Sequence, residues 1–221
     1  MAFTKVTGKV VSAEVRPGGE VLARRGAMLA YTGQVRFSPV GAGPGGGYGG
    51  GMAGALGRAM AGEAVAMMVA QGSGTVHYGY HGHHVTVVDL DGGSTLTVEA
   101  DRLLAHDAHL SSSVVFLGQQ GGLRGAVRGA VTGQGLFTTQ LSGRGSVALL
   151  SHGGTFPLQV GGGHQIVVDP QAFVASVGDL RVDVAANVSW RDAVGRGSGE
   201  AVQLKVSGQG TVYVQASEEK L

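Results

Sequence analysis

The sequence predicts an all-β protein built from three pseudo-symmetric repeats of short antiparallel strands, which form compact β-sandwich lobes. The first observation is a Gly-x-Gly-[Ser/Thr]-Val motif that occurs at residues 72–76 and again, with Arg or Gln between the glycines, at 143–147 and 208–212. The second is that 42 of the 221 residues are Gly, without the period of three that marks collagen. The third is the alternation of apolar and polar residues before the last motif, which is typical of a half-buried strand. A motif that recurs at such spacing indicates a duplicated unit.

The predicted strands follow the same order in each unit. A strand at 6–15 opens the chain, and a second at 21–23 ends in the basic corner Arg24-Arg25-Gly26, which the apolar triplet Met28-Leu29-Ala30 follows. The second and third units repeat this order with a constant offset of 70 (92 to 162). Their corners lie at 99–101 and 169–171, and their triplets are Leu103-Leu104-Ala105 and Phe173-Val174-Ala175. We therefore expect the three triplets to occupy equivalent buried positions.

Each unit ends in a strand that carries the repeated glycine motif. A phosphate-binding loop would need a helix directly after its glycines. Here a Ser or Thr and a Val follow instead, and they begin strands. We therefore expect tight strand-to-strand turns, some with φ > 0, at the second glycine of each motif, namely Gly74, Gly145 and Gly210.

The chain is predicted to be a single compact domain over residues 1–221, with repeats at about 1–78, 79–148 and 149–221. Three units of this length do not each bury a core well alone, so we expect them to share one core about a common pseudo-threefold axis. A Gly-rich insert at 41–62 interrupts the first unit. The Ala- and Met-rich run at 52–68 predicts one short helix there.

Charge and residue usage exclude several classes of function. The formal net charge is +1, with 16 basic and 15 acidic residues, which argues against a nucleic-acid-binding surface. Cysteine is absent, which excludes disulfides and thiolate chemistry and fits a reducing compartment. No run of about 20 apolar residues predicts a membrane-spanning helix, and the first residues do not resemble a signal peptide. We therefore expect a cytoplasmic protein.

The order of these motifs resembles the AIM24 family, formerly a bacterial domain of unknown function. The resemblance rests on residues 62–76 and 135–147, on 167–175, and on the final strand at 210–215. It implies a fold similar to the β-sandwich of the tryptophan-attenuation proteins, in triplicate. Mitochondrial members are linked to inner-membrane organisation and the maintenance of respiratory complexes, and the family brings no catalytic activity. The RNA and tryptophan sites of the attenuation proteins have no residue-by-residue match here.

Histidines supply the one candidate for metal chemistry. His77, His81, His83 and His84 lie within eight residues, and a His-x-His pair on a strand puts both rings on one face, as in cupin-type metal sites. Such a site also needs a Glu a few residues on, whereas the next acid is Asp89. We interpret the cluster as a solvated turn. His81 and His83 are the candidate ligands if a metal binds, and we expect no metal and no cofactor.

Three aspartates are candidates for general acids. Asp101, Asp107 and Asp169 lie at or near corners of the repeat, where Asp favours turns. No nucleophile with a base and an orienting group accompanies them. We therefore expect no catalytic residue and no enzymatic activity.

We expect a functional role for the insert rather than a role in packing, because the other two units have shorter loops. Met52, Leu56 and Met60 offer flexible apolar side chains to a partner. We expect that partner to be another protein chain, most simply a second copy in a homo-oligomer. Contact with a membrane surface has less support, because Arg58 is the only Lys or Arg between residues 41 and 68.

Two functions stay open at this point. The first is a non-enzymatic structural or protein-interaction protein of the AIM24 type. The second is a small-ligand or metal-binding cupin-like β-barrel, with or without an uncharacterised enzymatic activity.

Overall fold

A computed structural model describes residues 3–40, 66–116, 137–186 and 202–219. Within these residues the chain is almost entirely antiparallel β-sheet, and its one helical element is the 3-10 turn η1 (Ala100–Arg102). The predicted all-β class is therefore confirmed, whereas the helix predicted in the insert lies outside the described residues. The strands are β1 (Thr4–Thr7), β2 (Val10–Val15), β3 (Val21–Arg24), β4 (Met28–Pro39), β5 (Met67–Tyr78), β6 (His84–Glu99), β7 (Leu103–Asp107), β8 (Ser111–Phe116), β9 (Phe137–Ser151), β10 (Thr155–Val160), β11 (Ile166–Val168), β12 (Phe173–Ala186) and β13 (Val202–Gln215).

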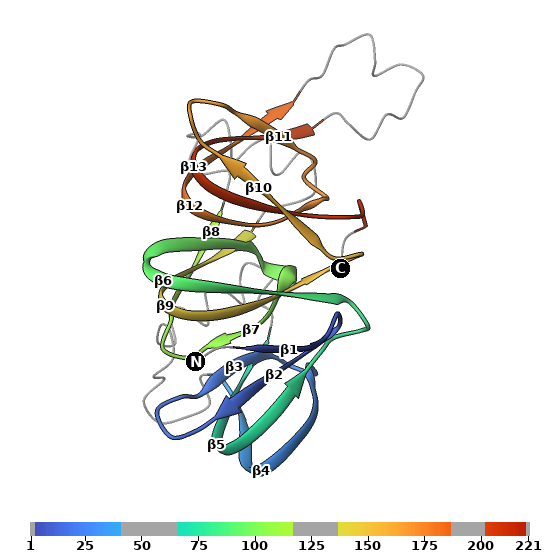
Figure 1. Cartoon of the computed structure of the whole chain (residues 1–221), viewed down its shortest axis with the longest axis vertical. Helices are drawn as coiled ribbons and strands as arrows, with labels where there is room; N and C mark the ends of the chain where they lie inside the picture. The colour runs from blue at the N-terminus through green and yellow to red at the C-terminus, as the bar shows by residue number, and fades with distance from the viewer. Residues whose placement is uncertain (1–2, 41–65, 117–136, 187–201, 220–221) are drawn as a thin grey trace.

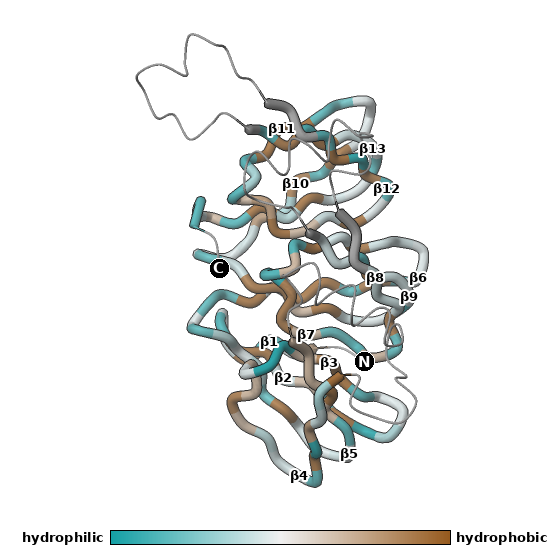
Figure 2. The backbone as a smooth tube through the Cα atoms, turned by 180° about the vertical axis from the view of Figure 1, so that it is seen from behind, coloured by the Kyte–Doolittle hydropathy of each residue, from teal (hydrophilic) through white to brown (hydrophobic). Residues whose placement is uncertain are grey.

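The strands form one continuous hydrogen-bonded sheet that folds over into three stacked lobes (Figure 1). The order is β1-β2-β5-β3-β7-β9-β6-β12-β13-β10, and β4, β8 and β11 pair beside this path with β5, β9 and β13. The first lobe holds β1 to β5, the second β6 to β9, and the third β10 to β13. Strands β4 and β11 lie at opposite ends of the long axis, as the view from behind also shows (Figure 2).

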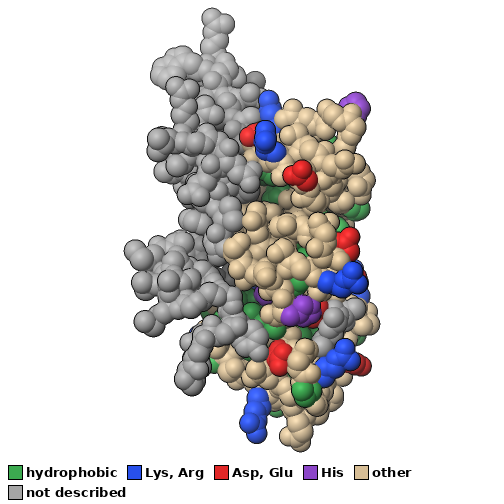
Figure 3. All heavy atoms as spheres, turned by 90° about the vertical axis from the view of Figure 1, so that its left-hand side faces the viewer, with side chains coloured by type: hydrophobic (Ala, Val, Ile, Leu, Met, Phe, Trp, Pro, Cys, Tyr) green, Lys and Arg blue, Asp and Glu red, His purple; other side chains and the backbone are tan. Residues whose placement is uncertain are grey.

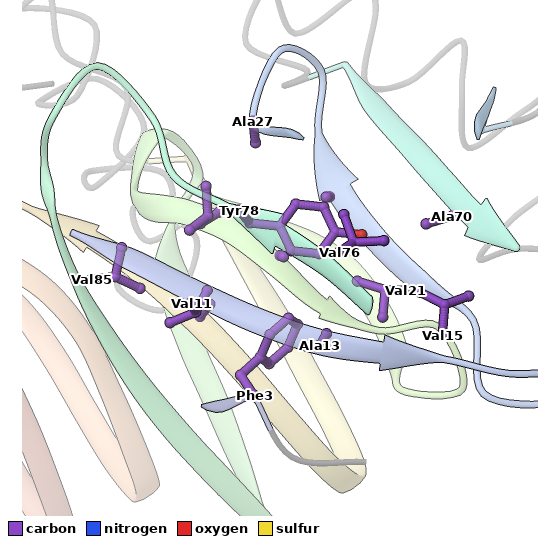
Figure 4. Close-up of a cluster of buried hydrophobic side chains, with 14 of the residues drawn as sticks. Phe3, Val11, Ala13, Val15, Val21, Ala27, Ala70, Val76, Tyr78 and Val85 are labelled. Carbon is purple, nitrogen blue, oxygen red and sulfur yellow. The ribbon is translucent and has the colours of Figure 1, made fainter. Parts of the chain in front are cut away.

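Each lobe is built around its own cluster of buried apolar side chains. The first cluster includes Val76 and Tyr78 (Figure 4), the second Leu96 and Leu141, and the third Leu204. The expectation of one core shared about a threefold axis is therefore wrong, because the lobes are joined in a column. The repeat boundaries near residues 78 and 148 stay a prediction.

The apolar triplets of the second and third lobes connect successive clusters. In β7, Leu103 packs in the second cluster and Leu104 in the first. In β12, Phe173 packs in the third cluster and Val174 in the second. Each of these strands thus closes the core of the preceding lobe as well as contributing to its own.

Short antiparallel ladders join the same lobes at the backbone level. β7 pairs with β3 of the first lobe over three residue pairs, and Leu22 lies opposite His106 at the centre. β12 pairs with β6 of the second lobe over three residue pairs, and Thr97 lies opposite Ser176 at the centre. We call these two ladders the internal joints.

The three triplets share one ladder position within their lobes. The first residue of each triplet pairs with a residue six positions after the first glycine of the repeated motif, and the register then shifts at a bulge. The pairs are Met28 with Tyr78, Leu103 with Leu149, and Phe173 with Val214.

The second glycine of each motif lies inside a strand rather than at a tight turn, so the turn prediction is wrong for Gly74, Gly145 and Gly210. Strands β5, β9 and β13 continue through the motif, and each pairs with three other strands. Gly74 is required by a close approach, because a Cβ there would lie 2.0 Å from the carbonyl oxygen of Thr32. Turns and close backbone approaches both favour glycine, so residue type alone does not separate them.

We expect Gly208→Ala to lower the free energy of unfolding by about 1–3 kcal/mol, the usual cost of backbone strain. Gly208 has a left-handed φ of 112°, and a Cβ there would lie 2.2 Å from the carbonyl oxygen of Asp179. Gly161→Ala is the matched control, because its Cβ would meet no atom within 4 Å. Urea denaturation measures both variants, and equal losses of stability would contradict this account.

Candidate interaction surface

A row of exposed apolar side chains lies at the start of β4. Met28, Leu29 and Tyr31 are 41%, 56% and 47% exposed. The ring of Tyr31 packs edge-on against that of Phe37, with the ring centres 5.5 Å apart. Single exposed apolar residues are ordinary on protein surfaces, whereas a contiguous group indicates an interaction site. We call Met28, Leu29 and Tyr31 the β4 surface.

The β4 surface is exposed because β4 is an edge strand. Ala30 and Tyr31 pair with His77 and Val76 of β5 on one side, and no strand within the described ranges pairs with β4 on the other. The corresponding strands of the other lobes, β7 and β12, pair on both sides, once within the lobe and once at an internal joint. An unpaired apolar edge is a template for a further strand.

The prediction that the first triplet is buried like the other two is wrong. The triplets at 103–105 and 173–175 are buried, whereas all three residues at 28–30 are exposed. The reason is that a preceding lobe covers β7 and β12, whereas no described strand pairs with the outer edge of β4. The first triplet therefore combines the residue types of a core with the exposure of a surface.

Arginines at or next to the corners reach across both internal joints. Arg24 donates from Nη2 to the carbonyl oxygen of Asp101 at 2.6 Å, and its guanidinium lies 4.8 Å from the ring centre of Tyr80. Arg102 donates from Nη2 to the carbonyl oxygen of Gln171 at 3.1 Å. Asp101 and Gln171 occupy the same corner position of successive units. At both joints, therefore, an arginine donates a hydrogen bond to the backbone carbonyl oxygen of that position.

Arg102 is fully buried at the joint between the second and third lobes. Its Nε donates to Glu99 Oε2 at 3.1 Å and its Nη1 to Gln215 Oε1 at 2.5 Å. Gln215 donates in turn to the carbonyl oxygens of Gln171 and Glu219 at 3.1 and 2.7 Å. This network ties the corner after β6 to the last strand and to the segment that follows it. No local motif identifies Arg102, because its partners lie as far as 117 positions away.

The candidate histidine ligands His81 and His83 lie near each other and beside His152. His83 packs edge-on against His152 with ring centres 4.5 Å apart, and the ring of His81 lies 6.5 Å from that of His83. Burial lowers the pKa of His83, and the charges of nearby His and Arg side chains lower it further. No three His, Cys, Asp or Glu side chains of the described segments form a group that could hold a metal ion.

The aspartates considered as general acids contact the backbone or an arginine. Asp107 is buried, and its Oδ2 accepts a hydrogen bond from the backbone N–H of Ser146 at 2.8 Å. Asp169 accepts one from the backbone N–H of Gln171 at 2.7 Å. Asp101 lies 3.9 Å from Arg24 Nη2. These contacts hold the corners and the ends of strands in place.

We expect the free energy of unfolding to fall as the pH is lowered through about 6.5, and to be level above that value. Burial lowers the pKa of His106 at the first internal joint, and the hydrogen bond from its ring to the carbonyl oxygen of Asp107 opposes this only in part. Unfolded histidine titrates near pH 6.5, so below that pH the unfolded chain binds more protons than the folded one. His106→Gln should reduce this pH dependence in urea titrations at several pH values. An unchanged slope would contradict the assignment to His106.

The predicted interaction residues Met52, Leu56 and Met60 lie outside the described residues. On the face drawn in Figure 3, acidic and basic side chains of the described part are interspersed, and neither sign gathers into a patch. Within the described segments no helix is long and apolar enough to cross a membrane.

Comparisons with known proteins agree with this architecture. A family model described as "Mitochondrial biogenesis AIM24" matches residues 3–217. The X-ray crystal structure of a protein from Streptococcus pyogenes, a structural genomics target, is similar with a TM-score of 0.72 and 20% sequence identity, over 97% of this chain and 92% of that chain. Likeness at this level of identity shows the fold alone. No curated protein matches the chain.

Proposed function

The chain belongs to the AIM24 family, and from this premise we propose that it is a non-enzymatic structural protein that acts by binding other protein chains. The observation that carries the proposal is the β4 surface. It combines a strand edge with which no described strand pairs and three large apolar side chains that are each more than two-fifths exposed. Pairing with another protein would satisfy the free backbone groups and remove the apolar side chains from water.

The surrounding chemistry supports a protein partner over other ligands. The net charge of +1 offers little attraction to the phosphates of a nucleic acid. The buried charged groups Glu99, Arg102 and Asp107 belong to the internal joints or contact the backbone. The absence of cysteine fits a reducing compartment, and we propose the cytoplasm as the location.

A photoreactive phenylalanine analogue at Tyr31 tests this proposal in cells. We expect covalent adducts with protein on irradiation, because the side chain at residue 31 lies in the β4 surface. The same analogue at Phe156 is the matched control, since Phe156 is an aromatic residue with a similar exposure of 45%. Equal labelling at the two positions would contradict the proposal. One equivalent of bound metal that is lost in His83→Ala would favour the metal-binding alternative instead.

A further inference from the structure

We propose that copies of this chain associate head to tail, with β11 of one copy pairing along the free edge of β4 in the next copy. The contact would be a third joint of the kind that the chain already contains twice. This inference rests on the proposed function, and it names the partner as a second copy of the same chain.

The first step is that β11 holds the same place in the third lobe as β3 and the end of β6 hold in theirs. Each of these segments pairs within its lobe with residues just before the repeated glycine motif. In each ladder the residue two positions before the motif's first glycine pairs with this segment, and these pairs are Val21 with Ala70, Leu96 with Leu141, and Ile166 with Val206. The outer edges of β3 and β6 then pair with the following lobe, at the internal joints.

The second step is that both halves of one further joint lie unpaired at the two ends of the molecule. β11 pairs only with β13 among the described strands, and β4 only with β5. The central residue of β11, Val167, is 53% exposed, and Tyr31 of β4 is 47% exposed. Strands β11 and β4 lie at opposite ends of the long axis (Figures 1 and 2).

The third step concerns the cores. Leu104 and Val174, the central residues of their triplets, are fully buried in the cluster of the preceding lobe. The corresponding residue of the first triplet is Leu29, which is 56% exposed. The third cluster, for its part, is bordered by the partly buried side chains of Leu158, Ile166 and Leu180. Leu29 of the next copy would close the third cluster as Leu104 closes the first.

The internal joints also define the register of the proposed contact. The central pair is Leu22 opposite His106 at the first joint and Thr97 opposite Ser176 at the second. The equivalent central pair of the proposed joint is Val167 opposite Tyr31 of the next copy. The flanking pairs would join Ile166 to Thr32 and Val168 to Ala30. The two exposed side chains thus become one cross-strand pair, the unit by which neighbouring strands stabilise each other.

Charge at the corners agrees with this register. At the first internal joint, the corner residue Arg24 donates to the carbonyl oxygens of Ala100 and Asp101. The equivalent residue of the third lobe is Asp169, and its equivalent partners in the next copy are Arg25 and Gly26. An acidic corner therefore meets a basic one, and Arg25 is exposed.

Such a contact is heterologous, since two different surfaces meet. It generates a ring if the rotation between copies closes and an open chain if it does not. A two-fold dimer through β4 alone would instead use the same surface twice. A substitution at Val167 distinguishes the two arrangements, because β11 takes part only in the head-to-tail contact.

Cysteine trapping tests the register directly, because the natural chain contains no Cys. Side chains directly opposite on paired strands have Cβ atoms about 4.5–5.5 Å apart, close to the reach of a disulfide. We expect a disulfide-linked dimer when Tyr31→Cys copies are mixed with Val167→Cys copies under mild oxidation. Tyr31→Cys mixed with Val6→Cys is the control, since Val6 is 50% exposed on β1. Equal yields in the two mixtures would overturn the proposal.

Single-ended variants test the head-to-tail arrangement without crosslinks. Light scattering should show a concentration-dependent rise in mass for the natural chain and for Val6→Lys. Lysine on an edge strand blocks pairing, so Leu29→Lys and Val167→Lys should each lose this rise. An equimolar mixture of the two variants should regain mass but stop at a dimer, because each copy keeps one intact surface. Circular dichroism checks that each variant is folded.

Three results would overturn the head-to-tail joint: a natural chain that stays monomeric at every concentration, a Val167→Lys variant that still associates, or a mixture that stays monomeric. If residue 31 is then photocrosslinked in cells to a different protein, the proposed function stands without this joint. If residue 31 yields no specific adduct either, the proposed function fails as well.

Discussion

Replacing Arg102 by Met should lower the free energy of unfolding by about 3–5 kcal/mol, the usual cost of removing one partner of a buried ion pair. Arg102 is fully buried, and its guanidinium donates to Glu99, Gln215, Gln171 and Glu219. Methionine fills much of the same volume, so the loss reports on charge and hydrogen bonds rather than on a cavity. Chemical denaturation measures the change.

Two further variants show whether the network at the joint causes the effect. Arg181→Met is the matched control, because Arg181 is exposed on β12 and a surface substitution is usually worth less than about 0.5 kcal/mol. Combining Arg102→Met with Glu99→Gln should recover part of the loss, since the buried carboxylate is removed together with its cation. If the double variant loses as much free energy of unfolding as the two single variants lose together, Arg102 and Glu99 act independently.

Leu104→Ala should lower the free energy of unfolding by about 2–5 kcal/mol, as large-to-small changes in cores do. Leu104 belongs to a strand of the second lobe, but its side chain is fully buried in the first cluster. The matched control is Leu29→Ala, the same change at the equivalent exposed position, and it should cost less than about 0.5 kcal/mol in dilute protein. Equal effects would contradict the equivalence of the two positions. Thermal and urea unfolding measure both variants.

The comparison of Leu29 with Leu104 shows what sequence predicts in this fold and what it leaves out. The repeated order of corner and apolar triplet predicted equivalent positions for the two residues. The pairing of both triplets agrees, because each of the two residues lies at the bulge between two paired residues. Burial differs because it depends on whether another lobe precedes the strand. That is a property of the whole chain, and neither the residue type nor its immediate neighbours encode it.

Other features of the candidate site depend on contacts that are distant in sequence. His83 packs against His152, and Arg102 contacts Gln215, because three lobes are stacked and not because of any local motif. The repeated glycines were recognised as backbone requirements, but a tight turn and a close strand approach give the same residue type at Gly74. The all-β class was predictable because alternation and glycine spacing are local signals.

The stacking of the lobes also determines how cooperatively the chain unfolds. No ladder between described strands joins the first lobe directly to the third, so stabilising contacts pass from each lobe to its neighbour. A linear array of this kind unfolds as a set of coupled segments, in which the strength of each joint decides how far disorder in one lobe spreads. A calorimetric enthalpy larger than the van't Hoff enthalpy would show that the segments melt separately. Weakening the second joint at Arg102 should widen that difference.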